Sequence, residues 1–425
     1  MEASDRISDL PNDLLLRILS LIPVSDAMST SQLSKRWKHV WKMLQKLVYD
    51  ETSCPNMGEF VQFCGRSLQL HDASLIKTID VKLRKHSDSL DSLFFPKLHS
   101  TVLEISVTST AYPIYYSFIT FPNNLNVFQT LVVLKLQGLI LLDVVESPVC
   151  FQSLKSLYLK CVKFESGDSF TALLSACPVL EDLFIHRRCS VRSFFFSISV
   201  PSLQRLSFTK EPGYYSEDEA IVEITAPSLN YLKIFDRVGS FSFLEDMPKL
   251  VEADVKVNLS KNEKLPKVVT SVERLSLDLY PSMVFHLEDR FISKKLGHLE
   301  LDIYDNFKSN LLLSLLKDVP YLRSLKLNHQ HPIYDLEDQP CSDSELSSVP
   351  DCLSFQYLET FQWIDYAGTY EEIQAAVYVL KNARCLKNAT ISLHSRGIEN
   401  DLMMMKKELE SMSKASTMCQ LFIKF

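Results

Sequence analysis

The chain has 425 residues, 46% of them hydrophobic, and a formal net charge of −7. This length allows two or three ordinary domains or one long repeat array, and the apolar content excludes global disorder. The acidic balance argues against a protein whose main task is binding phosphate backbones, which requires a basic field.

No basic segment followed by an apolar run opens the chain, and no apolar run reaches about 18 uninterrupted residues. We therefore expect neither a secretory signal nor contact with a membrane. The ten cysteines form no Cys-x-x-Cys pair, which argues against a zinc ribbon or a dense disulfide framework. These features together favour a reduced protein of the cytoplasm, the nucleus or both.

Three short helices are predicted within the first 45 residues. The first helix is indicated by apolar residues at helical spacing, at Leu10, Leu14, Leu15, Ile18, Leu19 and Ile22. Pro11 suits the start of this helix and Pro23 its end. A second helix is predicted to begin at Ser25 as its cap, and a third to carry Trp37 and Trp41.

Basic residues surround the two tryptophans of this segment, at Lys35, Arg36, Lys38, His39 and Lys42. A nucleic-acid-binding segment would spread its basic residues along one face of a basic domain. This segment instead has more apolar surface than about 45 residues can bury alone, and such helices usually dock onto a protein. We therefore predict a protein partner and no nucleic acid.

One phrase recurs along most of the chain: an apolar residue, two variable positions, then Leu-x-Leu or a close equivalent. Between Ile76 and Leu386 it occurs as IKTIDV, VLEISV, LVVLKL, LKSLYL, LEDLFI, LQRLSF, LNYLKI, LVEADV, VERLSL, LGHLEL, LRSLKL, LETFQW and LKNATI. Successive copies start 21–29 residues apart, apart from one interval of 36. Proline stands two places before the first leucine in CPVL, VPSL, APSL, MPKL and VPYL. This spacing predicts a leucine-rich-repeat solenoid.

Each Leu-x-Leu is predicted to be a short strand whose alternate residues face inward. The segments FTALLSA (170–176) and LLLSLLK (311–317) predict helices on the return leg of the repeat. No single repeat can bury its apolar face alone, so neighbouring repeats stack into one continuous core.

The remaining positions of the strands form an outward face, which solenoids use for binding. Our candidates for contact with a target protein are Tyr158, Lys160, Phe184, His186, Tyr231, Lys233 and Phe235. A plain solvated strand face is the alternative for each of them.

The 36-residue interval contains the acidic segment DLEDQPCSDSELSSVPD (335–351). It is predicted to be a solvated linker, with a docking or phosphorylated loop as the alternative. The next segment, YEEIQAAVYVLKNA (370–383), predicts a helix with Ile373, Val377 and Leu380 inward.

Signatures of enzymes do not occur in the sequence. The motifs GxGxxG, GxxxxGK[ST] and GxSxG are absent. His329 and His331 lack the i, i+4 spacing of a metal-binding helix, so we interpret them as a histidine pair in a loop. We predict no catalytic residue, no metal and no cofactor.

The N-terminal residues resemble an F-box. The matching residues are Leu10-Pro11, Leu14-Leu15, Ile18-Leu19, Pro23, Leu33-Ser34-Lys35-Arg36-Trp37 and Trp41. The C-terminal residues resemble the FBD domain of plant F-box proteins. Its matching residues are Val349-Pro350, Leu358-Glu359-x-Phe361-x-Trp363, Val379-Leu380-Lys381-Asn382-Ala383, Leu386-Lys387 and Ser416-Thr417-x-Cys419-Gln420-Leu421. With the repeats between them, the resemblance to plant F-box/leucine-rich-repeat/FBD proteins covers almost the whole chain.

This resemblance implies an α/β fold. A short three-helix F-box (1–50) would precede an irregular solenoid (51–334) with a curved parallel sheet and helical return legs. An acidic linker (335–346) and an α/β FBD region (347–425), stacked on or near the solenoid end, would follow.

The resemblance also implies a non-catalytic, substrate-recognition adaptor of an SCF-type, cullin-RING ubiquitin ligase. The F-box would bind a Skp-family adaptor, and through it the cullin and RING subunits. By matching position the contact residues would be Leu10, Pro11, Leu14, Leu15, Ile18, Leu19, Leu33, Trp37 and Trp41, some of which must also hold the three helices together. A small-molecule-gated F-box receptor and a scaffold outside a ligase are the alternatives.

Overall fold

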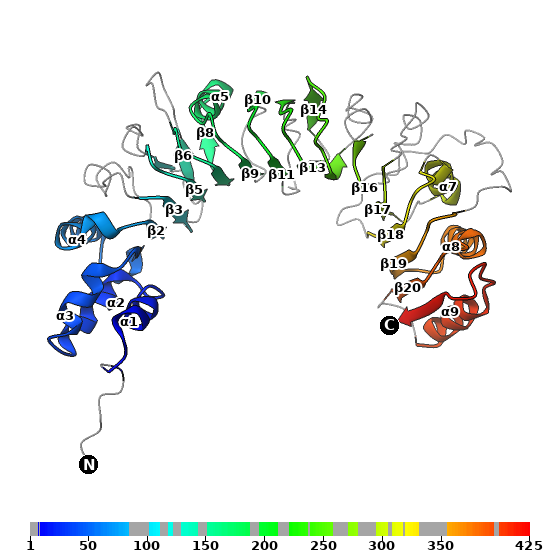
Figure 1. Cartoon of the computed structure of the whole chain (residues 1–425), viewed down its shortest axis with the longest axis horizontal. Coiled ribbons are helices and arrows are strands. Elements are labelled where there is room, and N and C mark those ends of the chain that lie inside the picture. The colour runs from blue at the N-terminus through cyan, green and yellow to red at the C-terminus, as the bar shows by residue number, and fades with distance from the viewer. Residues whose placement is uncertain are drawn as a thin grey trace, which may run out of the picture. The chain divides into compact units, whose positions relative to one another are not determined.

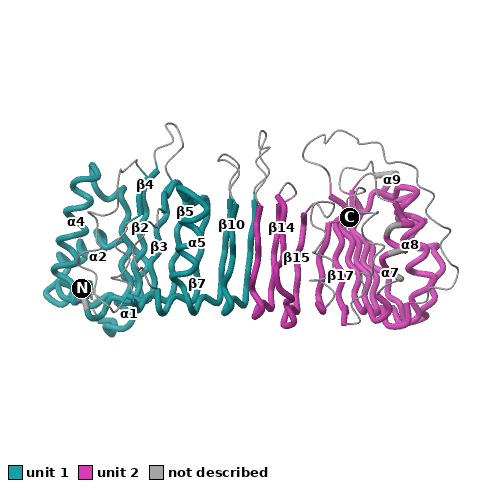
Figure 2. Tube along the Cα trace, turned by 90° about the horizontal axis from the view of Figure 1, so that it is seen from above, with its two compact units in different colours: residues 1–216 teal, residues 217–425 magenta. Residues whose placement is uncertain are grey.

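The computed structural model describes residues 7, 9–84, 102–110, 118–121, 129–142, 151–187, 195–210, 221–236, 239–257, 271–278, 295–304, 308–317, 319–330, 355–394 and 399–425. The chain forms two compact units, residues 1–216 and 217–425 (Figure 2). None of the helices in these ranges is both long and apolar enough to span a membrane.

Parallel strands form the main sheet of the first unit, in the order β1-β2-β3-β5-β7-β9-β11. Their bounds are β1 (Lys46–Asp50), β2 (Thr78–Leu83), β3 (Glu104–Ser109), β5 (Val133–Gln137), β7 (Ser156–Lys160), β9 (Asp182–Arg187) and β11 (Arg205–Lys210). The strands pair without a shift of register, so that Leu157 lies between Leu134 and Leu183. These inward leucines are buried, which confirms the strand phase predicted from the repeated phrase.

The return legs of the first unit form a second layer on one face of this sheet. It contains helix α5 (Gly167–Ser175) and the strands β4 (Ile119–Thr120), β6 (Ile140–Leu142), β8 (Lys163–Phe164) and β10 (Phe195–Ser199). Figure 1 shows α5 and β10 above strands β9 and β11. Phe170 of α5 packs edge-on against Phe164 and Phe196, with ring centroids 5.2 Å apart in each pair. Phe196 lies 6.4 Å from Phe208 of β11, so aromatic rings join the two layers.

The second unit contains the strands that follow in the chain. The main sheet has the order β13-β15-β16-β17-β18-β19-β20-β21, all parallel. The bounds are β13 (Tyr231–Asp236), β15 (Glu252–Val257), β16 (Arg274–Asp278), β17 (His298–Ile303), β18 (Ser324–His329), β19 (Thr360–Tyr366), β20 (Asn388–Leu393) and β21 (Gln420–Lys424). Its return legs include β12 (Ile221–Thr225), β14 (Ser240–Phe243), α7 (Ser309–Lys317), α8 (Tyr370–Asn382) and α9 (Glu399–Ser411).

The return legs are only partly helical. Helices α5 and α7 confirm the two helices predicted at 170–176 and 311–317. Between them in the chain, the return legs at β10, β12 and β14 are short strands. Their sequences FFSIS, IVEIT and SFSF alternate apolar and polar residues, apart from the first residue of the first two. They are rich in β-branched and aromatic types, which favour strands over helices.

The C-terminal region continues the main sheet of the second unit. Strand β19 pairs with β18, β20 with β19 and β21 with β20, each in parallel. A capping box at Thr369 and Glu372 fixes the start of α8. The helix is where the sequence predicts it, but its predicted inward face is wrong at two positions. Ile373 and Val377 are half-buried, and Ala375 and Ala376 are fully buried, because small side chains let the helix approach the sheet closely.

Candidate partner-binding surfaces

The three N-terminal helices pack around a small core of their own. They are α1 (Asn12–Leu19), α2 (Val24–Ser29) and α3 (Trp37–Val40). Helix α2 begins at Val24 with Pro23 as its N-cap, so the prediction of Ser25 as the cap is wrong by two residues. Proline has no N–H group of its own, so it adds no unsatisfied donor at the helix start.

The core divides the predicted adaptor-contact residues into two sets. Leu15, Leu19, Trp37 and Trp41 are all buried, with at most 4% of each residue exposed. They lie where α1 contacts α3 and the following turn, Trp41–Met43. Their position in the interior gives them the task of holding the helices together.

The surface of the same segment keeps a set of exposed apolar side chains. Leu14 is 45% exposed, Ile18 46% and Leu33 64%. Leu21, at 81%, continues the Leu14–Ile18 face of α1, one turn beyond Ile18. Pro11 is exposed beside this face and Leu10 is half-buried. These residues are available to a partner, and their contacts with one remain predictions.

Sequence reasoning missed Leu21 and Ile7, both exposed apolar residues in this segment. The i, i+3 and i, i+7 spacing of Leu21 from Ile18 and Leu14 was the signal that could have identified it.

A polar contact fixes α1 relative to α3. The Arg36 guanidinium donates to the Asn12 Oδ1 atom from Nη2 at 2.8 Å and also to the Leu10 carbonyl oxygen. Arg36, one of the basic residues around the tryptophans, therefore stabilises the packing of the helical segment itself. Lys42 lies above the Trp41 ring at 6.0 Å, the outer limit of a cation–π contact.

The helical segment is joined to the sheet by backbone hydrogen bonds and by a buried histidine. The Asp72 N–H donates to the Lys42 carbonyl oxygen, and the Lys77 N–H donates to the Gln45 carbonyl oxygen. His71 lies 6.3 Å from the Trp41 ring, at the end of α4 (Met57–Leu70). Burial lowers the pKa of His71 more than its hydrogen bond to the Asp72 carbonyl raises it.

The outer face of the first unit carries an aromatic pair. Tyr158 of β7 and Phe184 of β9 stack with ring centroids 5.0 Å apart and planes 18° apart. The Lys135 ammonium lies 5.6 Å from the Tyr158 ring and forms an ion pair with Glu104 at 2.7 Å. Phe184 is 42% exposed, so the stacked rings form an apolar ledge on an otherwise polar face.

The other two candidates of this unit lie beside the ledge. Lys160 and His186 are register partners, with Lys160 exposed and His186 within hydrogen-bond distance (2.8 Å) of the Thr209 hydroxyl. At the other end of β9, its first residue Asp182 accepts two hydrogen bonds, of 2.6 and 3.0 Å, from Arg205, the first residue of β11. Burial of Asp182 acts to raise the pKa of this carboxyl, but the hydrogen bonds from Arg205 and Ser156 outweigh it and lower the pKa.

The remaining candidates lie in the second unit, at Tyr231, Lys233 and Phe235 of β13. All three are half-buried, which agrees with an outward phase. The Lys233 ammonium donates to Asp254 at 2.8 Å, and this bond raises the pKa of the lysine. The structure thus brings Tyr158 and Phe184 together in one unit and ties Lys233 to an acid in the other.

Charged residues continue along the outer face of the second unit. Asn328 donates to Glu300 Oε1 at 2.7 Å and to Asp302 Oδ1 at 2.9 Å. Lys326 pairs with Glu300 at 2.8 Å, and Lys256 pairs with Asp302. Asp302 is almost fully buried, and such a charge is tolerated because its partners satisfy it.

No group of three or more His, Cys, Asp or Glu side chains is placed to hold a metal ion within the described ranges. The interpretation of His329 as a loop residue is wrong. His329 is the last residue of β18 and is buried against Glu372 of α8. Strand β18 extends this far because Asn328 and His329 both find polar partners inside the unit. The predicted linker (335–346) and His331 lie outside the described residues.

Comparison with known proteins identifies three stretches of the chain. Residues 7–49 match the F-box domain, and residues 344–391 match the FBD. Residues 91–242 match the leucine-rich repeats of the FBD-associated F-box protein At5g56370.

Several proteins of Arabidopsis thaliana resemble the chain over nearly its full length. The F-box/FBD/LRR-repeat protein At5g56810 is 77% identical, over 99% of this chain and 97% of its own length. The FBD-associated F-box protein At5g56820 is 47% identical, over 99% and 95% respectively. The F-box/FBD/LRR-repeat protein At4g26340 is 38% identical, over 98% and 99%.

Proposed function

Because the chain belongs to the plant F-box/FBD/LRR-repeat family, we propose that it recruits a target protein to an SCF-type, cullin-RING ubiquitin ligase. F-box proteins generally act as adaptors that bind a Skp-family protein. In this proposal the N-terminal helices dock onto the Skp-family adaptor, which links them to the cullin and RING subunits. The outer face of the repeats binds the target.

The exposed apolar face of the F-box carries the first part of the proposal. Leu14, Ile18 and Leu33 stay exposed although the segment has a complete core of Leu15, Leu19, Trp37 and Trp41. Exposed apolar side chains of this size gathered on one short segment are typical of a binding site. The interface would derive most of its affinity from a few such anchors.

The test of adaptor docking is co-purification of the full chain with a Skp-family protein. Leu14→Asp and Ile18→Asp place charges in the proposed interface and leave the buried core intact, so capture should fall at least tenfold. Leu70→Asp is the matched control, since Leu70 is 53% exposed at the end of α4, outside the F-box. Unchanged capture by both interface variants would refute docking through this face.

The aromatic ledge carries the second part of the proposal. Tyr158 and Phe184 expose stacked rings on the binding face, and aromatic residues are enriched in interfaces. A photo-crosslinking amino acid at position 184 should capture a protein other than the adaptor. The same probe at position 195, on the return layer, should not, although Phe195 is at least as exposed, at 49%. Identical products from both positions would remove the ledge from the target site.

Members of this family are typically non-catalytic adaptors, so the chemistry of ubiquitin transfer is expected on other subunits. The contribution of this chain would be to hold the target close to the transfer enzyme, which raises its effective concentration there.

A further inference from the structure

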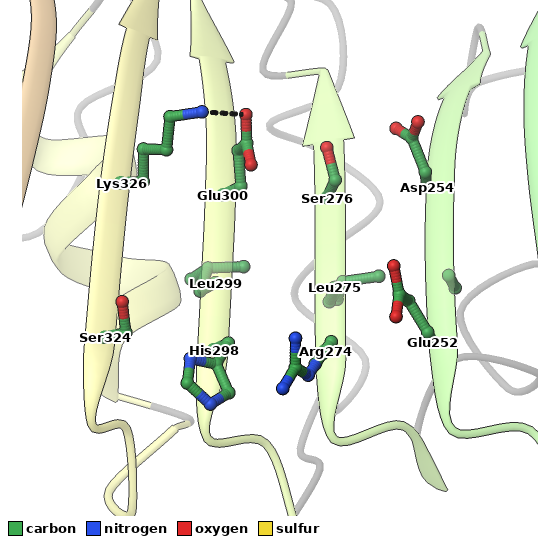
Figure 3. A pocket seen from close by; sticks show the side chains of 11 residues that line it. Glu252, Asp254, Arg274, Leu275, Ser276, His298, Leu299, Glu300, Ser324 and Lys326 are labelled. Atoms are coloured by element: carbon green, nitrogen blue, oxygen red, sulfur yellow. Dashed lines mark hydrogen bonds and ion pairs between the residues drawn. The ribbon is translucent and has the colours of Figure 1, made fainter.

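We propose that the outer face of strands β15–β18 binds an extended segment of the target that carries one acidic and one basic side chain two residues apart. This inference rests on the proposed recruitment of a target and adds the chemistry of the segment that is recognised. The site is a hollow of about 250 Å³ on this face, shown in Figure 3.

Two rows of polar side chains line the hollow (Figure 3). Asp254, Ser276 and Glu300 are register partners on three neighbouring strands and form one row. The second row lies two residues earlier in each strand. It contains Arg274 of β16 and His298 of β17, which are register partners. We call the first the acidic row, although it continues into Lys326 on β18, and the second the basic row, although it begins with Glu252 on β15.

The acidic row has unused capacity to accept hydrogen bonds. The Lys233 ammonium occupies Asp254 Oδ2, and Lys326 and Asn328 both donate to Glu300 Oε1. Asp254 Oδ1 is buried and has no hydrogen-bond partner among the described residues. Ser276, between the two acids, has a short side chain that leaves a notch. Neighbouring strands lie about 4.8 Å apart, so the backbones that carry Asp254 and Glu300, two strands apart, are separated by about 9.6 Å. Their carboxylates flank a gap above Ser276 that fits a guanidinium or ammonium group.

The basic row is open to an anion. Within the described part of the chain, Arg274 forms no ion pair, although exposed Glu252 is its register partner on β15. Its other register partner, His298, has a pKa lowered by burial and then by the positive charges of Arg274 and Arg323. A carboxylate bound here would pair with the Arg274 guanidinium and would offset the positive charges of Arg274 and Arg323.

The spacing of the two rows determines the ligand. Residues i and i+2 of a strand point to the same side and lie about 6.6 Å apart, and this distance separates Arg274 from Ser276. An extended ligand along the strands presents its own i and i+2 side chains at the same spacing. An acid at one position would reach Arg274, and a base two residues away would reach the notch between Asp254 and Glu300. Adjacent charges would instead point to opposite faces of the ligand.

The test uses two fluorescein-labelled peptides with a Thr/Val-rich background, one with Asp-Thr-Arg and one with Asp-Arg-Thr at its centre. Anisotropy titrations are run with the full chain, alone and in complex with its adaptor. The spaced peptide should bind at least tenfold more tightly than the adjacent one. Asp254→Asn and Arg274→Gln should each lower the ratio of the two affinities at least tenfold. Lys82→Gln, at an exposed outward position of β2 in the other unit, should leave it unchanged.

A charge swap completes the test. Arg274→Glu should lose the Asp-Thr-Arg peptide and bind a Lys-Thr-Arg peptide better than the native chain does. Equal affinity of the native chain for the spaced and adjacent peptides, absence of binding, or no effect of the Asp254 and Arg274 variants would overturn the inference. Loss of adaptor capture by the native chain would instead overturn the proposed function, because the peptide titration does not depend on the adaptor.

Discussion

His329 Nδ1 on strand β18 lies 2.8 Å from the Glu372 carboxylate on helix α8, and both side chains are at most 2% exposed. The second oxygen of Glu372 accepts the backbone N–H groups of Ala367 and Thr369, at 3.1 and 2.9 Å. One buried carboxylate therefore satisfies a strand end, a turn and a helix start. Next to it, Glu371 accepts two hydrogen bonds from Ser309, at the start of α7.

Glu372→Ala should lower the free energy of unfolding by about 3 kcal/mol, because it breaks a buried pair and leaves the N–H groups and the histidine unsatisfied. Thermal unfolding of the full chain measures the loss. Glu410→Gln, on the exposed side of α9, is the control and should change stability by less than about 0.5 kcal/mol. A melting temperature equal in all three proteins would contradict this role of Glu372.

Trp37→Ala should behave differently from Leu33→Ala although both residues belong to the F-box. Trp37 is buried, so its truncation should cost about 3–5 kcal/mol of stability. Leu33 is exposed, so its truncation should leave stability within about 0.5 kcal/mol and act only on adaptor binding. Limited proteolysis of residues 7–49 separates the two outcomes. Equal protease resistance of native and Trp37→Ala protein would show that the tryptophan is not part of the core.

Stability should fall as the pH is lowered from 7 to 5, in part through His71. Its folded pKa lies below that of the unfolded state, so below about pH 6.5 the unfolded chain binds a proton that the folded chain does not. The lowered pKa values of Asp182 and Glu300 act at more acidic pH, since these carboxylates stay ionised in this window. The melting temperature of His71→Gln should therefore depend less steeply on pH between 7 and 5. An identical slope for both proteins would exclude a contribution from His71.

Gly138→Ala should be strongly destabilising. Gly138 follows β5 with a φ of +105°, and a Cβ atom there would lie 2.0 Å from the Ser109 carbonyl oxygen. The positive φ costs about 1–2 kcal/mol for a non-glycine residue, and the clash adds to it. Gly297→Ala is the matched control, because its nearest neighbour would be 3.9 Å away. Comparable melting temperatures for the two variants would contradict the steric argument.

The repeat predicted most of the fold, because each Leu-x-Leu phrase states which side chains face inward. The phrase starting at Leu131 predicts a strand where β5 lies, with Leu134 and Leu136 buried. The sequence did not predict in the same way which apolar residues of the F-box are buried and which are exposed. Leu14 and Leu15 are identical in type and both fit helical spacing, and only the position of α3 decides which one is buried.

Polar contacts between distant elements were also beyond the sequence. His329 and Glu372 are 43 residues apart, and no local pattern pairs them. The hollow on β15–β18 depends on the register of separate strands, which places Ser276 between two acids. The aromatic pair of Tyr158 and Phe184 shows the contrasting case, because equivalent positions of consecutive repeats become neighbours whenever the repeats stack in register.

The pairing of β19, β20 and β21 onto β18 means that the FBD is not a detachable module. In a shortened chain that ends before β19, β18 would become an edge strand with unpaired backbone N–H and C=O groups. It would also strip α8 from His329 and Ser309. Such an edge invites association with other chains, so the shortened protein should form aggregates. Loss of activity after deletion of the FBD would then report damage to the solenoid, and only point substitutions can reveal whether the FBD has a partner of its own.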